Sequence, residues 1–176
     1  MPRFRRIENA DRLFFVTANL HRGVTPLTER ERDIVLMALT AAREKHPFDL
    51  AGYVVMPDHV HLIVVPGPDG LGNLMHAFKR SAHYKIALEK TRSGELWQPR
   101  FFDNIIRRVR DFWEKLEYIH NNPVAAGLAT APNNWRWTSY GAYWGGATPI
   151  VPVNKLNLPT DGAAVIWPAP WKRPGS

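Results

Sequence analysis

Two histidines separated by one residue stand at the start of an apolar, β-branched stretch. His59 and His61 follow the turn signal Pro57-Asp58 and lead into the residues Leu62-Ile63-Val64-Val65, which are typical of a strand. Side chains alternate between the two faces of a strand, so we expect both imidazoles on one face. Paired imidazoles on a rigid strand make half of a divalent-metal site, although they also occur on solvated sheet faces. A metal site therefore requires a third ligand from another part of the chain.

Tyr118 and Asn122 are the groups that would complete such a site. They are four residues apart in a segment with helical periodicity, so they lie on one helix face. The amide oxygen of Asn122 suits Mg²⁺ or Mn²⁺ beside two imidazoles. A phenol is a poor nucleophile at neutral pH, but a nearby cation makes its phenolate more accessible. In-line attack by Tyr118 on a phosphodiester would leave a phosphotyrosine and a free hydroxyl, and the reverse step would join a new strand.

Each of these residues also has a simpler interpretation. Tyr118 alone is typical of a packed aromatic, and Asn122 alone is typical of a helix end before Pro123. Tyr84 is a rival nucleophile, but it has no amide or carboxylate four residues later. We expect His120 to pack or to form a hydrogen bond locally rather than to bind metal.

The charge of the chain favours a polyanionic partner. The 176 residues carry a formal net charge of +7 with a sequence pI of about 10.0. The sequence contains no cysteine and no apolar run long enough for a membrane span, and its basic start lacks the apolar core of a secretory signal. We therefore expect a bacterial cytoplasmic protein that binds nucleic acid and no membrane. The candidate contacts to DNA are Lys79, Arg80, Arg100, Arg107, Arg108 and Arg110, with Arg3, Arg5 and Arg6 near the N-terminus.

Periodicity and turn signals predict an alternation of strands and helices. The expected strands are 12–20, 51–56, 59–65 and 96–106, and the expected helices are 28–46, 71–88 and a third that ends at Asn122-Pro123. This order suits an α+β fold of the ferredoxin-like kind, an antiparallel sheet with helices packed on it. We expect a nuclease domain at 1–145 with the aromatic residues 135–144 covering an edge of its core. Residues 146–176 are expected to form a Pro-rich extended tail, ordered only where Ile150, Val151, Trp167 or Trp171 finds a groove.

Together these motifs resemble one family, the REP-associated tyrosine transposases among the single-tyrosine HUH endonucleases. The main matches are Met56-Pro57-Asp58-His59-Val60-His61-Leu62-Ile63 and Tyr118-Ile119-His120-Asn121-Asn122-Pro123-Val124. Shorter matches occur at 74–80, 96–98, 102–103, 106–107 and 137–140, so the likeness covers roughly residues 10–145. The sequence departs from the family pattern at Asp58, Asn104, Asn121 and Ala125, none of which is a catalytic position.

The resemblance implies a ferredoxin-like HUH fold and metal-dependent cleavage and rejoining of single-stranded DNA. It implies a 5′-phosphotyrosine intermediate on Tyr118 and the metal ligands His59, His61 and Asn122. The implied substrate carries hairpins of repeated extragenic palindromes, and the implied protein is a monomer or a homodimer. Two other functions stay open: a non-catalytic nucleic-acid-binding module, and a hydrolase that uses water on a His-His-Asn metal.

Overall fold

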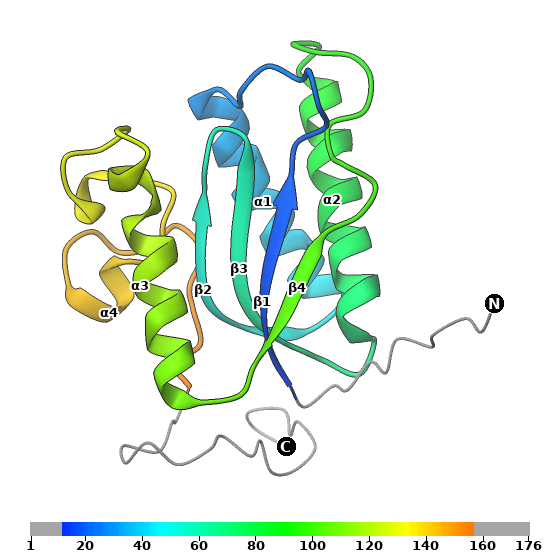
Figure 1. Ribbon diagram of the computed structural model, residues 1–176. Coiled ribbons are helices and arrows are strands. Elements are labelled where there is room, and N and C mark those ends of the chain that lie inside the picture. Colours follow the sequence, from blue (N-terminus) through cyan, green and yellow to red (C-terminus); the bar gives the residue numbers. More distant parts are fainter. Residues whose placement is uncertain (1–11, 157–176) are drawn as a thin grey trace.

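The computed structural model describes residues 12–156, which form a four-stranded sheet with helices on both faces (Figure 1). The strands are β1 (Leu13–Asn19), β2 (Phe48–Val55), β3 (His59–Pro66) and β4 (Phe102–Ile106). The helices are α1 (Glu29–Lys45), α2 (Gly70–Leu88), α3 (Val109–Ala125) and the one-turn α4 (Gly141–Trp144), with a 3-10 turn η1 (Pro132–Asn134). All strand pairs are antiparallel in the order β2-β3-β1-β4. The predicted α+β, ferredoxin-like architecture is confirmed.

The two central strands are apolar on both faces because helices cover both. Figure 1 shows α1 and α2 behind the sheet, and α3 packs on the opposite face. The approach of α3 depends on Gly52 in β2, where a Cβ would lie 2.7 Å from Leu116 Cδ1 and 3.3 Å from Ile119 Cδ1. A larger residue at 52 would force the side chains of Leu116 and Ile119 to repack.

Helix α3 does not end at Asn122-Pro123 as the sequence predicts. It continues to Ala125 with Pro123 buried inside its last turn, where a missing N–H removes only one helical hydrogen bond. The end is set by Gly127, whose φ of +71° favours glycine. The Leu128 N–H then donates to the Pro123 carbonyl (2.8 Å) and the Gly127 N–H to the Val124 carbonyl (2.9 Å), which closes a Schellman motif.

Two predicted strand boundaries are also wrong. The strand expected at 96–106 begins only at Phe102, and the part before it makes one isolated bridge, Leu20 to Trp97. Pro99 lacks the N–H that a continuous ladder needs, and the Lys79 ammonium donates to the carbonyls of residues 98 and 99 instead. Strand β2 starts at Phe48, earlier than predicted, because a bulge between Leu50 and Gly52 lets the pairing continue.

The aromatic segment 135–144 covers the free edge of β2, as predicted. The Val55 N–H donates to the Trp137 carbonyl (2.9 Å), and the Ser139 N–H donates to the Tyr53 carbonyl (3.0 Å). Trp135 and Trp137 are buried. This cover satisfies backbone groups that an open sheet edge would expose.

Residues 146–156 return to the sheet, whereas the proposed division at residue 145 stays a prediction. Val151 is buried and its N–H donates to Tyr53 Oη (3.0 Å), while Ile150 is exposed. Asn154 exchanges hydrogen bonds with the backbone of Leu50. Trp167, Trp171, Arg3, Arg5 and Arg6 lie outside the described residues.

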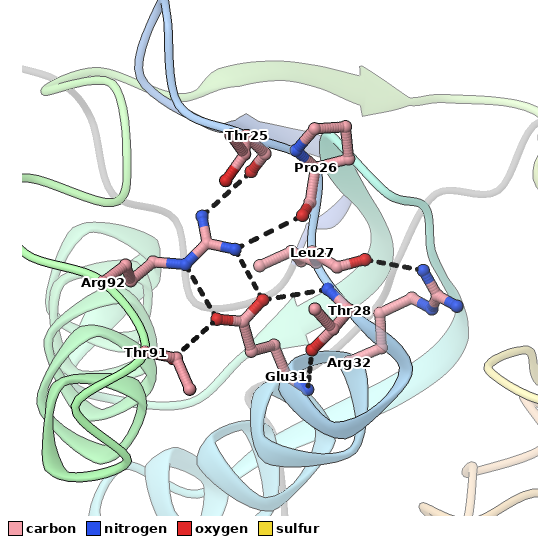
Figure 2. Close-up of polar contacts among 8 residues, drawn as sticks. All are labelled: Thr25, Pro26, Leu27, Thr28, Glu31, Arg32, Thr91 and Arg92. Atoms are coloured by element: carbon pink, nitrogen blue, oxygen red, sulfur yellow. Dashed lines mark hydrogen bonds and ion pairs between the residues drawn. The ribbon is translucent and has the colours of Figure 1, made fainter.

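A buried ion pair joins the start of α1 to the loop after α2, as Figure 2 shows. Thr28 caps α1 and forms a capping box with Glu31. The Glu31 carboxylate also accepts from Arg92 Nε (2.8 Å), Arg92 Nη2 (2.5 Å) and Thr91 Oγ1 (3.1 Å). Arg92 donates further to the carbonyls of Thr25 and Pro26. Burial has the largest single effect on the pKa of Glu31 and would raise it, but the hydrogen bonds from Arg92, Thr28 and Thr91 and the charge of Arg92 together lower it.

Candidate active site at a histidine pair and a tyrosine

The histidine pair lies on the face of β3 that α3 covers. The ring centroids of His59 and His61 are 4.6 Å apart, so the two imidazoles share one face as the strand alternation predicts. His61 is stacked on Phe15 of β1 at 5.1 Å. Because both rings lie on one strand and each is held by a neighbouring side chain, little entropy remains to be lost when they bind a common ligand.

One nitrogen of His61 is bonded and the other is buried without a partner. Nδ1 lies 2.9 Å from Thr17 Oγ1, on the neighbouring strand. Nε2 has no hydrogen-bond partner among the described residues, although His61 is only 5% exposed. Burial, followed by the charges of His59 and Lys115, lowers the pKa of His61 to about 3 against the opposing effect of Asp58. The imidazole is therefore neutral at pH 7, and with Nδ1 donating to Thr17 it presents a lone pair on Nε2.

A carboxylate orients the second histidine. Asp58 Oδ1 lies 2.7 Å from His59 Nδ1. An Nδ1–H that donates to this carboxylate fixes the ring orientation and leaves the lone pair on Nε2, as in many metal-bound histidines. Asp58, one of the departures from the family pattern, thus has a physical role beside the pair.

The structure brings Tyr118 of α3 to the histidines. Its ring centroid lies 5.5 Å from that of His61 and 6.1 Å from that of Phe15. Tyr118 is 52% exposed, which is unusual for a large aromatic beside a core and leaves it accessible to a macromolecule. The contact occurs within one chain, so the site does not require a helix from a second copy.

Asn122 follows Tyr118 by one turn inside α3 and is half-buried. Within residues 12–156, no group of three His, Cys, Asp or Glu side chains is able to hold a metal. A metal site at the pair would need a third ligand of another kind, for which an amide oxygen is suitable. Two imidazoles on one strand, one of them with a buried Nε2 that has no partner among the described residues, fit a divalent cation chemically. The ligand role of Asn122 stays a prediction.

Lys115 is a site residue that sequence reasoning missed. Its Nζ lies 4.8 Å from the ring centroid of Phe15 and 5.9 Å from that of Tyr118. It is three residues before Tyr118, so the helix places both side chains on one face. That spacing was the available signal, but the packing of α3 on β1 is what brings the ammonium to the site.

The predicted DNA-contacting residues fall into two groups. Lys79 and Arg80 of α2 line a groove of about 500 Å³ with Trp97 and Phe101, and exposed Arg100 belongs to the same loop. Gln98 also lines this groove, and its N–H donates to the carbonyl of Asn19 (3.0 Å). Because Asn19 pairs with His59, the groove reaches the end of the sheet where the histidines lie.

Arg107, Arg108 and Arg110 do not adjoin the histidine pair. Arg107 follows Ile106, which pairs with Leu13 at the start of β1. His59 pairs with Asn19 at the other end of β1. Arg110 lies 3.4 Å from Glu114. The cation beside the tyrosine is Lys115.

The rival nucleophile Tyr84 lies on another helix than Tyr118, and His120 faces the segment that leads into α4. Tyr84 is exposed on α2, and α2 packs on the face of the sheet opposite to α3. His120 is buried, and its Nε2 lies 2.7 Å from Ser139 Oγ. It packs and forms a hydrogen bond as expected, but the partner lies in the segment that leads into α4 and not nearby in the sequence.

Comparisons with known proteins match the chain to a family of transposases. The family model described as "Transposase IS200 like" matches residues 18–122. The chain is 25% identical over 142 residues to the REP-associated tyrosine transposase of Escherichia coli (strain K12), covering 80% of this chain and 83% of that protein. It is 27% identical over 152 residues to a putative REP-associated tyrosine transposase of Haemophilus influenzae (strain ATCC 51907 / DSM 11121 / KW20 / Rd), covering 80% and 86%.

A solved structure shares the fold. It is a REP-associated tyrosine transposase bound to a REP hairpin, with a TM-score of 0.70 and 23% identity, covering 90% of this chain and all of the other. The resemblance seen in the sequence is thus confirmed. No helix in the described part of the chain is long and apolar enough to cross a membrane.

Proposed function

Because the chain belongs to the IS200-like transposase family, we propose that it nicks and rejoins single-stranded DNA with Tyr118 as the nucleophile. The observation that carries this proposal is the exposed Tyr118 ring 5.5 Å from His61, whose buried Nε2 has no partner among the described residues. A buried nitrogen with a free lone pair beside an accessible phenol suits metal-assisted attack by the phenol.

The proposed step is an in-line displacement at phosphorus. Tyr118 Oη forms a bond to the phosphorus as the bond from phosphorus to the 3′ oxygen breaks. The phenolic proton passes to solvent, and the departing 3′ oxygen takes up a proton to become a hydroxyl. The product is a 5′-phosphotyrosine, whose bond energy is retained for attack by a new 3′ hydroxyl in the reverse reaction.

His59, His61 and Asn122 would hold Mg²⁺ or Mn²⁺. When bound, the cation supplies Lewis-acid polarisation of the phosphate. Asp58 and Thr17 orient the two imidazoles through their Nδ1 atoms. Lys115 supplies a positive charge beside Tyr118 and neutralises phosphate charge from the protein side.

The DNA substrate follows from the basic groove and from the relatives. The phosphate backbone would lie in the groove on α2 and contact Arg80 and Arg100. Phe102 is exposed on the strand next to Thr17, which in turn pairs with His61, and its ring would stack an unpaired base. The structural relative binds a REP hairpin, so we infer that this chain also binds hairpins of repeated extragenic palindromes, in the bacterial cytoplasm. The contact between Tyr118 and His61 within one chain favours a monomer that works alone over a dimer that exchanges helices.

The test is a covalent adduct. Purified protein is incubated with Mg²⁺ or Mn²⁺ and a labelled oligonucleotide that carries a hairpin and its single-stranded flanks, and the mixture is separated under denaturing conditions. We expect an adduct with the wild type and none with Tyr118→Phe, which retains DNA binding. Binding without any adduct would indicate a non-catalytic module, and cleavage that survives Tyr118→Phe would indicate a hydrolase that uses water.

A further inference from the structure

A hollow of about 510 Å³ lies on the other flank of Tyr118 from the histidines, between α3 and the segment that leads into α4. Its walls include Glu117, Tyr118, His120, Tyr140 and Trp144. This volume is within the range of sites that hold small organic groups. Because Tyr118 lines the hollow and also contacts His61, a molecule bound here would lie directly beside the nucleophile.

One residue that lines the hollow has a buried polar atom with no hydrogen-bond partner in the described part of the chain. His120 is 2% exposed; its Nε2 bonds to Ser139, but its Nδ1 has no hydrogen-bond partner among the described residues. Trp144 packs edge-on against the imidazole at 4.9 Å and Tyr140 at 5.7 Å. Because His120 lines the hollow, its unpartnered nitrogen is the group of this residue that would bond the polar edge of a planar ligand bound there.

The charges on the two flanks of Tyr118 are opposite. Lys115 lies on the histidine side, whereas Glu114 and Glu117 line the hollow, and Glu114 is partly neutralised by Arg110 at 3.4 Å. Carboxylates repel a phosphate but accept hydrogen bonds from the exocyclic amino group of a base. Trp144, 43% exposed, offers a face on which a base can stack.

We propose that this hollow binds the base of a nucleotide next to the cleaved phosphate and prefers a base with an exocyclic amino group to thymine. Trp144 and Tyr140 stack the base, and Glu117 and His120 bond its polar edge. The inference rests on the proposed function, since it takes the phosphate beside Tyr118 to belong to single-stranded DNA.

The first test uses Tyr118→Phe protein, which keeps the ring but cannot form the adduct. Hairpin oligonucleotides carry 2-aminopurine, a fluorescent base, at one unpaired position at a time. Stacking should quench the fluorescence at one position about threefold or more upon binding. Trp144→Leu should abolish that quenching, whereas Tyr84→Leu, which removes an exposed aromatic from α2, should leave it unchanged. Quenching at no position, or quenching that persists in Trp144→Leu, would overturn the proposal.

The second test guards against a folding defect in Trp144→Leu. At the quenched position the wild type should bind DNA containing cytosine or adenine about tenfold more tightly than DNA containing thymine. Glu117→Gln should reduce this preference to about threefold or less, and Glu44→Gln on the exposed side of α1 should not change it. An unchanged preference in Glu117→Gln contradicts the assignment of the carboxylate. An adduct without quenching refutes the base site alone, whereas quenching without an adduct refutes the nicking reaction alone.

Discussion

Glu31 and His61 are both almost completely buried polar side chains, but their hydrogen bonds differ. Each oxygen of Glu31 accepts from two donors, Arg92 and a threonine at each (Figure 2). His61 bonds through Nδ1 only, and its Nε2 has no partner among the described residues. A buried unsatisfied polar group costs about 1–3 kcal/mol of folding free energy. The fully bonded cluster serves stability, whereas the lone pair of His61 Nε2 is available to the proposed metal.

The largest expected effect is the loss of activity in His61→Leu. This change removes an essential nitrogen, so metal-stimulated nicking should fall at least about 1,000-fold, equivalent to about 4 kcal/mol of transition-state stabilisation. The midpoint of thermal unfolding in a chelator should be no lower than that of the wild type, because an orphaned polar atom is also removed. His46→Leu is the control and should keep nicking within about twofold. Nicking that is retained in His61→Leu would contradict a role of His61 Nε2 in the reaction.

Arg92→Ala should lower the stability of the protein and leave its nicking activity unchanged. It leaves the Glu31 carboxylate buried without its cation, which should cost about 3 kcal/mol of unfolding free energy in denaturant titrations. Arg30→Ala, which breaks the exposed ion pair with Glu89, should cost less than about 1 kcal/mol. Nicking by the folded fraction of Arg92→Ala should match the wild type, and a selective loss of activity would contradict the division between the two regions.

Acid should destabilise the protein through its buried neutral histidines. The pKa of His61 and that of His120 are each lowered from 6.5 to about 3, chiefly by burial. The unfolded chain therefore binds more protons than the folded one between these values, so stability falls as pH decreases below 6.5. Each histidine should cost about 2 kcal/mol between pH 7 and pH 5.

Unfolding in denaturant at pH 7, 6 and 5 with a chelator checks this expectation. His61→Leu should lose only about half as much stability as the wild type over the same range, because one of the two groups is gone. Glu31, whose pKa is lowered from 4.5, contributes only at lower pH. A stability that is flat from pH 7 to pH 5 would contradict the burial of neutral imidazoles.

The smallest effect concerns the carboxylate beside His59. Asp58→Asn keeps an acceptor for His59 Nδ1 but removes its charge, so affinity for Mn²⁺ should fall about tenfold in calorimetric titrations. Asp69→Asn alters a similar carboxylate–histidine pair, with His46, away from the site and should leave the affinity unchanged. Equal Mn²⁺ affinities of the wild type and Asp58→Asn would contradict the proposal that the charge of Asp58 orients His59 for metal binding.

The sequence predicted the parts of the site that depend on local geometry. Strand alternation placed His59 and His61 on one face, and helical spacing placed Tyr118 and Asn122 on another. Lys115 was missed because its role arises only when α3 packs across Phe15. The end of α3 was misplaced because Pro123 is a weaker terminator in a last turn than Gly127 is at positive φ.

The most direct test of the central claim locates the covalent bond. After reaction with hairpin DNA, trypsin cleavage at Lys115 and Arg136 should release residues 116–136, in which Tyr118 is the single tyrosine. We predict by mass spectrometry that this peptide carries the 5′-phosphate of the cleaved strand. A nucleotide found instead on residues 81–85, which contain Tyr84, or on no tyrosine at all, would contradict the account.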